Sequence, residues 1–265
     1  MLKKFGSRKT LLVTGLTLLF LAGCETNPVS GRQQLVLVSE EQAQQASAQA
    51  YAQTLAEAQS KGKLNDNAAL TARVKRITDR LIVQAGNMYP ESRNWKWSIA
   101  VIDEPKLNAW AMPGGKMAIY TGIIQKLALT DDEIGQIMGH EISHALLGHG
   151  RERMSRAMAT QSGLQLGSIL AGRDLSVLAP AANIALNLPN SRDAESEADR
   201  YGIELAARAG YDPRASISLW EKMTRASSGS QPPQFLSTHP APGNRIQALQ
   251  ALVPKMMPVY EKARA

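Results

Sequence analysis

The sequence predicts an α+β, predominantly helical fold built around one small β-sheet. Apolar residues recur at helical spacing in several long segments, of which Ser39–Ser60 and Asn67–Gln84 come first. Three much shorter segments alternate in the way that strands do, and they lie at Gln33–Val38, Trp95–Asp103 and Met117–Thr121. The 242 residues that follow Gly23 suffice for one good core, so we expect a single compact domain.

Residues 1–23 are expected to be a secretory signal peptide. A basic start (Lys3, Lys4, Arg8 and Lys9) precedes an apolar run from Leu11 to Leu21, which is too short for a normal membrane span. The segment ends in Leu21-Ala22-Gly23-Cys24, which resembles the lipobox of bacterial lipoproteins. We therefore expect lipidation of Cys24, the only cysteine of the chain. The alternative is a plain signal peptide followed by an incidental thiol.

The residue after Cys24 bears on where such a lipoprotein would reside. Glu25 rather than Asp follows the cysteine, and by resemblance to the sorting rule of Gram-negative lipoproteins this favours the outer membrane. We expect a lipid anchor on the periplasmic side of the bacterial outer membrane. Residues 24–38 would then form a tether with the first strand, and residues 39–265 one domain.

The charge of the chain gives no reason to expect nucleic acid as a partner. The formal charge of +7 falls to about +3 without the expected signal, since 26 basic residues then face 23 acidic ones. No basic run with interleaved aromatic residues occurs.

The segments before residue 130 are expected to form scaffold helices and a small sheet. Ser39 with Glu40 to Gln42 opens the first helix, and Pro113-Gly114 suits the centre of a type II turn between two strands. The strand at 117–121 could use a free edge to pair with an extended peptide. The alternative for this strand is an ordinary hairpin.

The most informative segment is a helix that carries the pattern H-E-x-x-H. Thr130 and Glu133 form a capping box at its start, followed by an apolar stripe. His140 and His144 are four residues apart and share one helix face, with Glu141 beside them. The pattern predicts two zinc ligands and a catalytic base. The alternative is a chance occurrence on an ordinary amphipathic helix.

His149 and the segments that follow it are expected to have structural roles. His149 lies five residues after His144, about 140° around a continuous helix, so we expect it to point away as a structural or outer-sphere histidine. A polar helix is expected at Arg151–Met158. The stretch Gln161–Leu188 is rich in Ala, Leu and Gly, and it is expected to form either two short core helices or a flap over the site.

A third metal ligand is expected on a helix at Ser191–Ala207. Catalytic zinc normally has three protein ligands and one open position. Glu195 and Asp199 are four residues apart and share a face, so Glu195 can bind the metal while Asp199 orients a ligand histidine. Glu197 lies on the opposite side of this helix. The alternative is a surface helix with ordinary ion pairs.

The remaining segments are expected to close the fold. A helix should start at Tyr211-Asp212-Pro213 and run to about Thr224, and a last helix should begin near Asn244. A polar loop at 227–233 leads to a segment that contains His239.

Four motifs in order resemble the zinc metalloendopeptidase family of the CAAX prenyl protease, BepA and LoiP type. Along the chain they read NAWAMPGGKMAIYTG, HEISHALLGH, SRDAESEADRYG and FLSTHPAPGNRI. The resemblance implies a zincin-like domain whose edge strand borders the active-site helix, with one Zn²⁺ bound by His140, His144 and Glu195. It also implies that Asp199 supports a ligand and that His239 approaches the metal. Prenylated substrates and a repeat-based partner are not expected.

The expected activity is hydrolysis of peptide bonds in misfolded or unassembled envelope proteins. Glu141 would act as the general base, and His239 would either stabilise the developing oxyanion or occupy the open metal position. One alternative is a lipoprotein chaperone or assembly factor with a structural zinc. A weaker alternative is hydrolysis of cell-wall peptides. Oligomeric state has no readable signal in the sequence.

Overall fold

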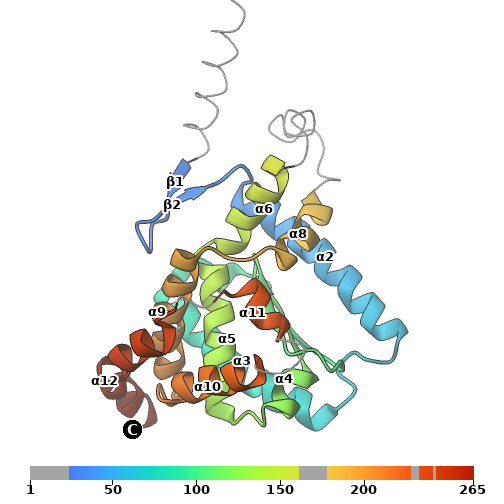
Figure 1. Cartoon of the computed structure of the whole chain (residues 1–265). Coiled ribbons are helices and arrows are strands. Elements are labelled where there is room, and N and C mark those ends of the chain that lie inside the picture. The colour runs from blue at the N-terminus through green and yellow to red at the C-terminus, as the bar shows by residue number, and fades with distance from the viewer. Residues whose placement is uncertain (1–23, 161–177, 228–232, 241–242) are drawn as a thin grey trace, which may run out of the picture.

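The computed structural model describes residues 24–160, 178–227, 233–240 and 243–265. The strands are β1 (Cys24–Thr26), β2 (Gln33–Leu35), β3 (Ser98–Ile102), β4 (Ala109–Met112) and β5 (Lys116–Tyr120). The helices are α2 (Glu40–Ser60), α3 (Ala68–Met88), the 3-10 helix η1 (Pro90–Asn94), α4 (Thr121–Lys126), α5 (Asp131–Leu146), α6 (His149–Thr160), α8 (Leu178–Asn187), α9 (Arg192–Arg208), α10 (Ala215–Ser227), α11 (Gln234–Thr238) and α12 (Arg245–Arg264). This mostly helical arrangement with small sheets confirms the predicted fold class (Figure 1).

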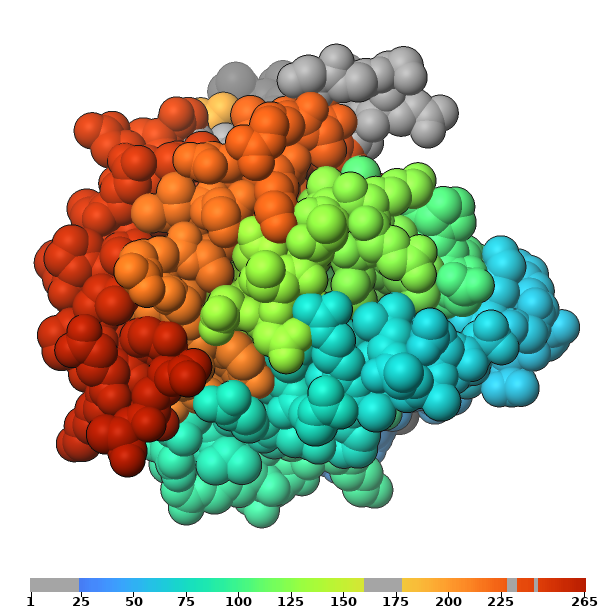
Figure 2. All heavy atoms as spheres, turned by 90° about the horizontal axis from the view of Figure 1, so that it is seen from below, coloured from blue at the N-terminus to red at the C-terminus, as the bar shows by residue number. Residues whose placement is uncertain are grey.

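Helix α5 is the centre of the fold. It packs against α9, α3, α10 and β4, and Figure 1 shows it in the middle of the molecule. Figure 2 shows α12 and α10 on one side of the start of α5 and α3 on the other. Burial on nearly every side gives α5 a fixed position, which suits a helix that carries functional side chains.

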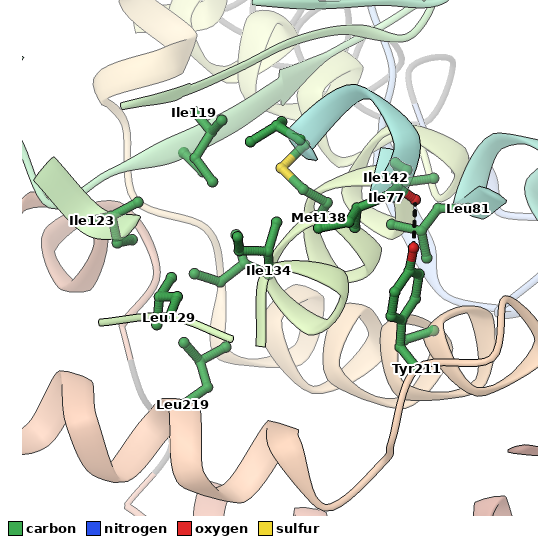
Figure 3. Close-up of a cluster of buried hydrophobic side chains, with 14 of the residues drawn as sticks. Ile77, Leu81, Ile119, Ile123, Leu129, Ile134, Met138, Ile142, Tyr211 and Leu219 are labelled. Atoms are coloured by element: carbon green, nitrogen blue, oxygen red, sulfur yellow. Dashed lines mark hydrogen bonds between the residues drawn. The ribbon is translucent and has the colours of Figure 1, made fainter. Parts of the chain in front are cut away.

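The main core lies between α5, α3 and the sheet. Ile134, Met138 and Ile142 of α5 are fully buried among side chains of neighbouring elements (Figure 3). Tyr211, just after α9, packs into the same core and donates a hydrogen bond of 3.3 Å to the carbonyl of Ile77. The core therefore ties the segment after α9 to α3 as well as to α5.

The sheet differs from the prediction in its strand order. Its order is β3-β5-β4, with β5 parallel to β3 and antiparallel to β4. The predicted edge strand at 117–121 is β5, and it lies in the middle of the sheet. The edge strand that borders α5 is β4, a segment that the sequence analysis treated as a connection. Strand pairing depends on non-local hydrogen bonds, so the order could not be derived from alternation alone.

A second core cluster lies between α2, α6, α8 and the sheet. Small side chains dominate it, including Ala43, Ala46 and Ala50 of α2, and they allow α2 and α8 to pack closely. Helix α8 packs one face into this core. Of the two structures expected for Gln161–Leu188, core helices and a flap, this part is therefore a core helix. Residues 161–177 of that stretch lie outside the described residues.

Four of the predicted helices begin directly after a residue whose side chain caps them. Ser39, Asn67, Thr130 and Ser191 are N-caps whose side chains accept a hydrogen bond from a backbone amide of the first turn. Helix α10 begins at Ala215, two residues after Pro213, and Asp212 accepts a hydrogen bond from the Arg214 amide just before it. Among the helices of the described ranges, none combines the length and apolar character needed to cross a bilayer.

Candidate metal centre

Four buried side chains converge beside α5. His140 and His144 come from α5, Glu195 from α9 and His239 from the end of α11, and their potential ligand atoms all lie within 4.8 Å of one another. The Nε2 atoms of His140 and His144 are 3.0 Å apart. Glu195 places Oε1 3.2 Å from His144 Nε2 and Oε2 3.4 Å from His140 Nε2.

These distances and donors fit a zinc ion. In a tetrahedral zinc site with bonds of about 2.0–2.1 Å, neighbouring ligand atoms lie roughly 3.3 Å apart. Two imidazole nitrogens and a carboxylate are also a ligand set that catalytic zinc commonly uses. Burial lowers the pKa of His144 well below its usual value, which keeps this imidazole neutral as a metal ligand must be. His140, His144 and Glu195 would therefore hold zinc.

Two glycines allow α9 to bring Glu195 to the histidines. A Cβ atom at Gly202 of α9 would lie 2.8 Å from His140 Cα, and one at Gly139 would lie 2.9 Å from the Gly202 carbonyl oxygen. Any larger side chain would separate the two helices, because the neighbouring atoms belong to backbone. The close crossing of α5 and α9 is thus a condition for the ligand geometry.

Asp199 lies where the sequence analysis expected it. Its Oδ1 is 3.1 Å from His140 Nδ1, on the side of the ring that faces away from the other ligands. Burial alone would lower the pKa of His140, but Asp199 and Glu195 together raise it to about 10. The carboxylate of Asp199 therefore orients this ring and increases its basicity.

Glu141 is positioned as a proton acceptor rather than as a ligand. Its side chain is 2% exposed, and its Oε1 has no hydrogen-bond partner of good geometry among the described residues. Burial raises the pKa of Glu141 to about 8, which the nearby His140 opposes. The Ala111 backbone of β4 also donates a hydrogen bond to this carboxyl group. The unpartnered oxygen can accept a proton from water or substrate.

His239 adds a fourth imidazole to the site. Its Nδ1 lies 3.0 Å from Thr238 Oγ1 and 3.1 Å from the Phe235 carbonyl oxygen, and its ring stacks on Phe235. These contacts direct Nε2 toward Glu141, whose Oε1 is 3.3 Å away. Burial lowers the pKa of His239 to about 3, so the ring is neutral. This position is compatible with both roles expected for His239.

His149 does not point away as predicted. Gly148 adopts a φ of +67°, which ends α5 and starts α6 in a new direction. The predicted direction of His149 assumed a continuous helix and was wrong for this reason, whereas its contact with His144 agrees with the outer-sphere role that was expected. His149 Nδ1 lies 2.7 Å from His144 Nδ1, and its Nε2 lies 2.9 Å from Glu197 Oε2. Glu197, which was expected on the opposite side of its helix, thereby also connects to the metal site.

The sequence pattern described as "Peptidase family M48" matches residues 68–253, a range that includes the four convergent side chains. This chain belongs to peptidase family M48. The family predicted from the four motifs is thereby confirmed.

The chain is similar to several curated M48-type proteins. It is 32% identical over 255 residues to the mitochondrial metalloendopeptidase OMA1 of Homo sapiens, covering 89% of this chain and 47% of that protein. It is 28% identical over 180 residues to metalloprotease LoiP of Escherichia coli, covering 66% of this chain and 69% of that protein. The beta-barrel assembly-enhancing protease of E. coli is 30% identical over 178 residues, which cover 60% of this chain and 35% of that protein. The chain thus spans about half the length of the first of these relatives.

The M48 site of this chain contains two residues that the sequence analysis missed. Asn190 Nδ2 donates to Glu195 Oε1 at 2.7 Å. Arg245 donates to Glu195 Oε2 and, at 2.6 Å, to Asp199 Oδ2, while its guanidinium lies 4.0 Å from the centre of the Trp220 ring. Both residues are buried and hold the carboxylates in place. Arg245 lies inside the motif FLSTHPAPGNRI, which was the available signal for it.

Proposed function

We propose that this chain is a zinc-dependent endopeptidase. The observation that supports it is a buried ligand cluster of His140, His144 and Glu195 with the unpartnered oxygen of Glu141 beside it. When bound, zinc supplies Lewis-acid chemistry, which acidifies water and polarises a carbonyl group. Membership of peptidase family M48 supports peptide bonds as the bonds that are hydrolysed.

The side chains of the site divide the work of hydrolysis. Glu141 takes a proton from the attacking water at Oε1 and delivers it to the leaving nitrogen. His239 places Nε2 3.3 Å from Glu141 Oε1. Because its Nδ1–H donates to the Phe235 carbonyl, Nε2 donates a hydrogen bond to charge that develops on the scissile carbonyl oxygen only once it has taken up a proton. The side chains of the site are nearly fully buried, and a site that excludes bulk water strengthens these interactions.

Strand β4 is the proposed docking edge for the substrate backbone. One side of β4 pairs with β5, and no strand within the described ranges pairs with its other side. The strand borders α5, and its Ala111 contacts Glu141, so a peptide added to this edge would lie beside the reacting groups. A peptide bound to an inactive variant should slow hydrogen exchange of β4 amides, and unchanged exchange would contradict this role.

Removal of zinc is expected to abolish hydrolysis of a protein substrate such as casein. A chelator should lower the initial rate at least 100-fold, and stoichiometric zinc should restore it, because the base alone cannot activate water sufficiently. The rate is measured with a quenched fluorescent casein. Undiminished cleavage in the chelated protein would contradict the proposal. Zinc binding without any cleavage would favour the chaperone alternative.

We further propose that the protein acts on envelope proteins from a lipid anchor at Cys24. The lipobox-like sequence supports the anchor, and Cys24 is exposed at the start of β1. The similarity to a beta-barrel assembly-enhancing protease supports envelope proteins as substrates. Glu25 after the cysteine supports the outer membrane as the location.

Replacement of Cys24 by Ser is expected to release the protein from membranes. The thiol is the acceptor of the lipid, so the variant should move from the membrane pellet to the soluble fraction of expressing cells. Immunoblots of the two fractions, with mass spectrometry of the mature N-terminus, measure this. A variant that sediments as the wild type does would contradict the anchor.

A further inference from the structure

A chain of hydrogen bonds leads from the metal site to the N-terminal segment. His144 Nδ1 contacts His149 Nδ1 at 2.7 Å, and His149 Nε2 contacts Glu197 Oε2 at 2.9 Å. Glu197 Oε2 in turn accepts from Arg32 Nε at 2.9 Å. The other two nitrogens of Arg32 donate to Glu152, from Nη2 to Oε2 at 2.6 Å and from Nη1 to Oε1 at 3.2 Å. Three consecutive contacts thus join His144, a proposed metal ligand, to Arg32, which lies 112 positions earlier.

This series of hydrogen bonds determines which ring nitrogen of His144 carries the proton. Glu197 forms an ion pair with Arg32, whose Nε lies 2.9 Å from Glu197 Oε2, so its side chain is a carboxylate. An ionised carboxylate only accepts, so His149 Nε2 must donate to it. A neutral imidazole that donates through Nε2 has a lone pair at Nδ1, so His149 Nδ1 accepts from His144 Nδ1 at 2.7 Å. His144 Nε2 is then left with a free lone pair toward Glu195.

Arg32 reaches this position because its segment is docked on the metal-site helices. Asn27 and Gln34 side chains both donate to the Leu147 carbonyl at the end of α5, at 2.8 and 2.9 Å. Tyr201 of α9 donates to the Val29 carbonyl at 3.0 Å. The segment therefore bridges the end of α5 and the side of α9. It lies before the residues that match the M48 pattern, which begin at 68.

We propose that the N-terminal segment Asn27–Gln34 is a working part of the metal site, acting through Arg32, Glu197 and His149 on His144. These three are positioning residues, and the inference rests on the proposed zinc site. Docked, the segment holds His144 in the tautomer that binds zinc. If the segment undocked, the Glu152 and Glu197 carboxylates would lose the Arg32 guanidinium that they share. The hydrogen bonds from Glu197 through His149 to His144 would then no longer be held in place. The segment next to the proposed lipid anchor would thus set zinc affinity.

The test compares zinc affinity in variants of the full mature chain. Glu197→Gln and Arg32→Gln are measured by competition with a chromophoric chelator, together with thermal unfolding of the apo and zinc-loaded proteins. Loss of such an outer hydrogen-bond partner typically weakens metal binding about 10- to 100-fold. We expect a rise of that size in the zinc Kd and a smaller zinc-induced increase in Tm. The visible spectrum of the cobalt-substituted protein should change as well.

Glu204→Gln is the matched control. Glu204 lies on the same helix, α9, but pairs only with Arg208 at the surface among the described residues. This variant should keep the wild-type zinc Kd. Arg32→Lys is the conservative variant, since it retains the charge but cannot bond Glu152 and Glu197 at once. Its Kd should fall between those of the wild type and Arg32→Gln, and it covers the case in which Arg32→Gln does not fold.

The outcomes separate this inference from the proposed function. A wild-type chain that binds no zinc would remove the proposed zinc site itself. If the wild type binds zinc and the Arg32 and Glu197 variants match it within twofold, the inference is overturned while the function stands. Equal losses of Tm in apo and loaded forms with an unchanged Kd would show a purely structural segment, which also overturns it.

Discussion

Replacement of Glu141 by Gln is expected to lower the rate of peptide hydrolysis by about 1,000-fold, within the usual range for loss of a general base. Gln has nearly the same shape, but its amide cannot take a proton from water. Glu141 is not part of the ligand cluster His140, His144, Glu195 and His239, so zinc should remain bound. The measurements are kcat with a fluorescent peptide and zinc content by mass spectrometry.

The control for this experiment again uses a Glu→Gln change elsewhere. Glu204→Gln should leave kcat unchanged, because Glu204 lies on the surface and pairs with Arg208. Substantial turnover by the Glu141→Gln protein with bound zinc would exclude Glu141 as the base. Loss of zinc from that protein would instead show that Glu141 supports the ligands.

Replacement of Gly202 by Ala is expected to damage both stability and the metal site. The added methyl group would lie 2.8 Å from His140 Cα and 2.9 Å from His140 N, and backbone cannot move aside as a flexible side chain can. Overpacking of this kind typically costs about 1–3 kcal/mol of unfolding free energy. Because α9 must shift away from α5, Glu195 should also move away from the histidines and zinc binding should weaken. Denaturant unfolding and chelator competition measure the two effects.

A matched glycine outside the helix crossing makes the comparison specific. Among the described residues other than its chain neighbours, no heavy atom lies within 4 Å of a Cβ atom built at Gly243, so Gly243→Ala should change the unfolding free energy by about 0.5 kcal/mol or less. Equal effects of the two substitutions would show that the α5–α9 approach does not depend on Gly202. A stable Gly202→Ala protein with wild-type zinc affinity would contradict the geometric argument.

Local patterns in the sequence predicted the helices of the site accurately. The N-caps Thr130 and Ser191 mark the starts of α5 and α9, because capping depends on residues within one turn. The helical period also places His140 near His144, and it places Glu195 and Asp199 on one face. His239 was expected near the metal only through the resemblance to a family, since nothing in its neighbouring residues indicates where α11 packs.

The errors concern contacts between residues that are distant in sequence or separated by a break. The helical wheel failed for His149 because the positive φ of Gly148 redirects the chain. Alternation detected β5 but not its central place in the sheet, because pairing is decided by partners elsewhere. Arg32 carried no signal at all, since its partner Glu197 lies 165 residues away.

The sequence by itself determined the two helices that carry His140, His144 and Glu195, the pair of imidazoles with the adjacent base, and the family to which the chain belongs. These depend on short-range periodicity and on motifs that occupy consecutive positions. Only the tertiary structure decided how closely α9 approaches α5, which strand has the open edge, and that the N-terminal segment reaches His144 through His149. Such contacts arise when separately formed elements pack, so their physical cause is steric fit and hydrogen-bond pairing between distant segments.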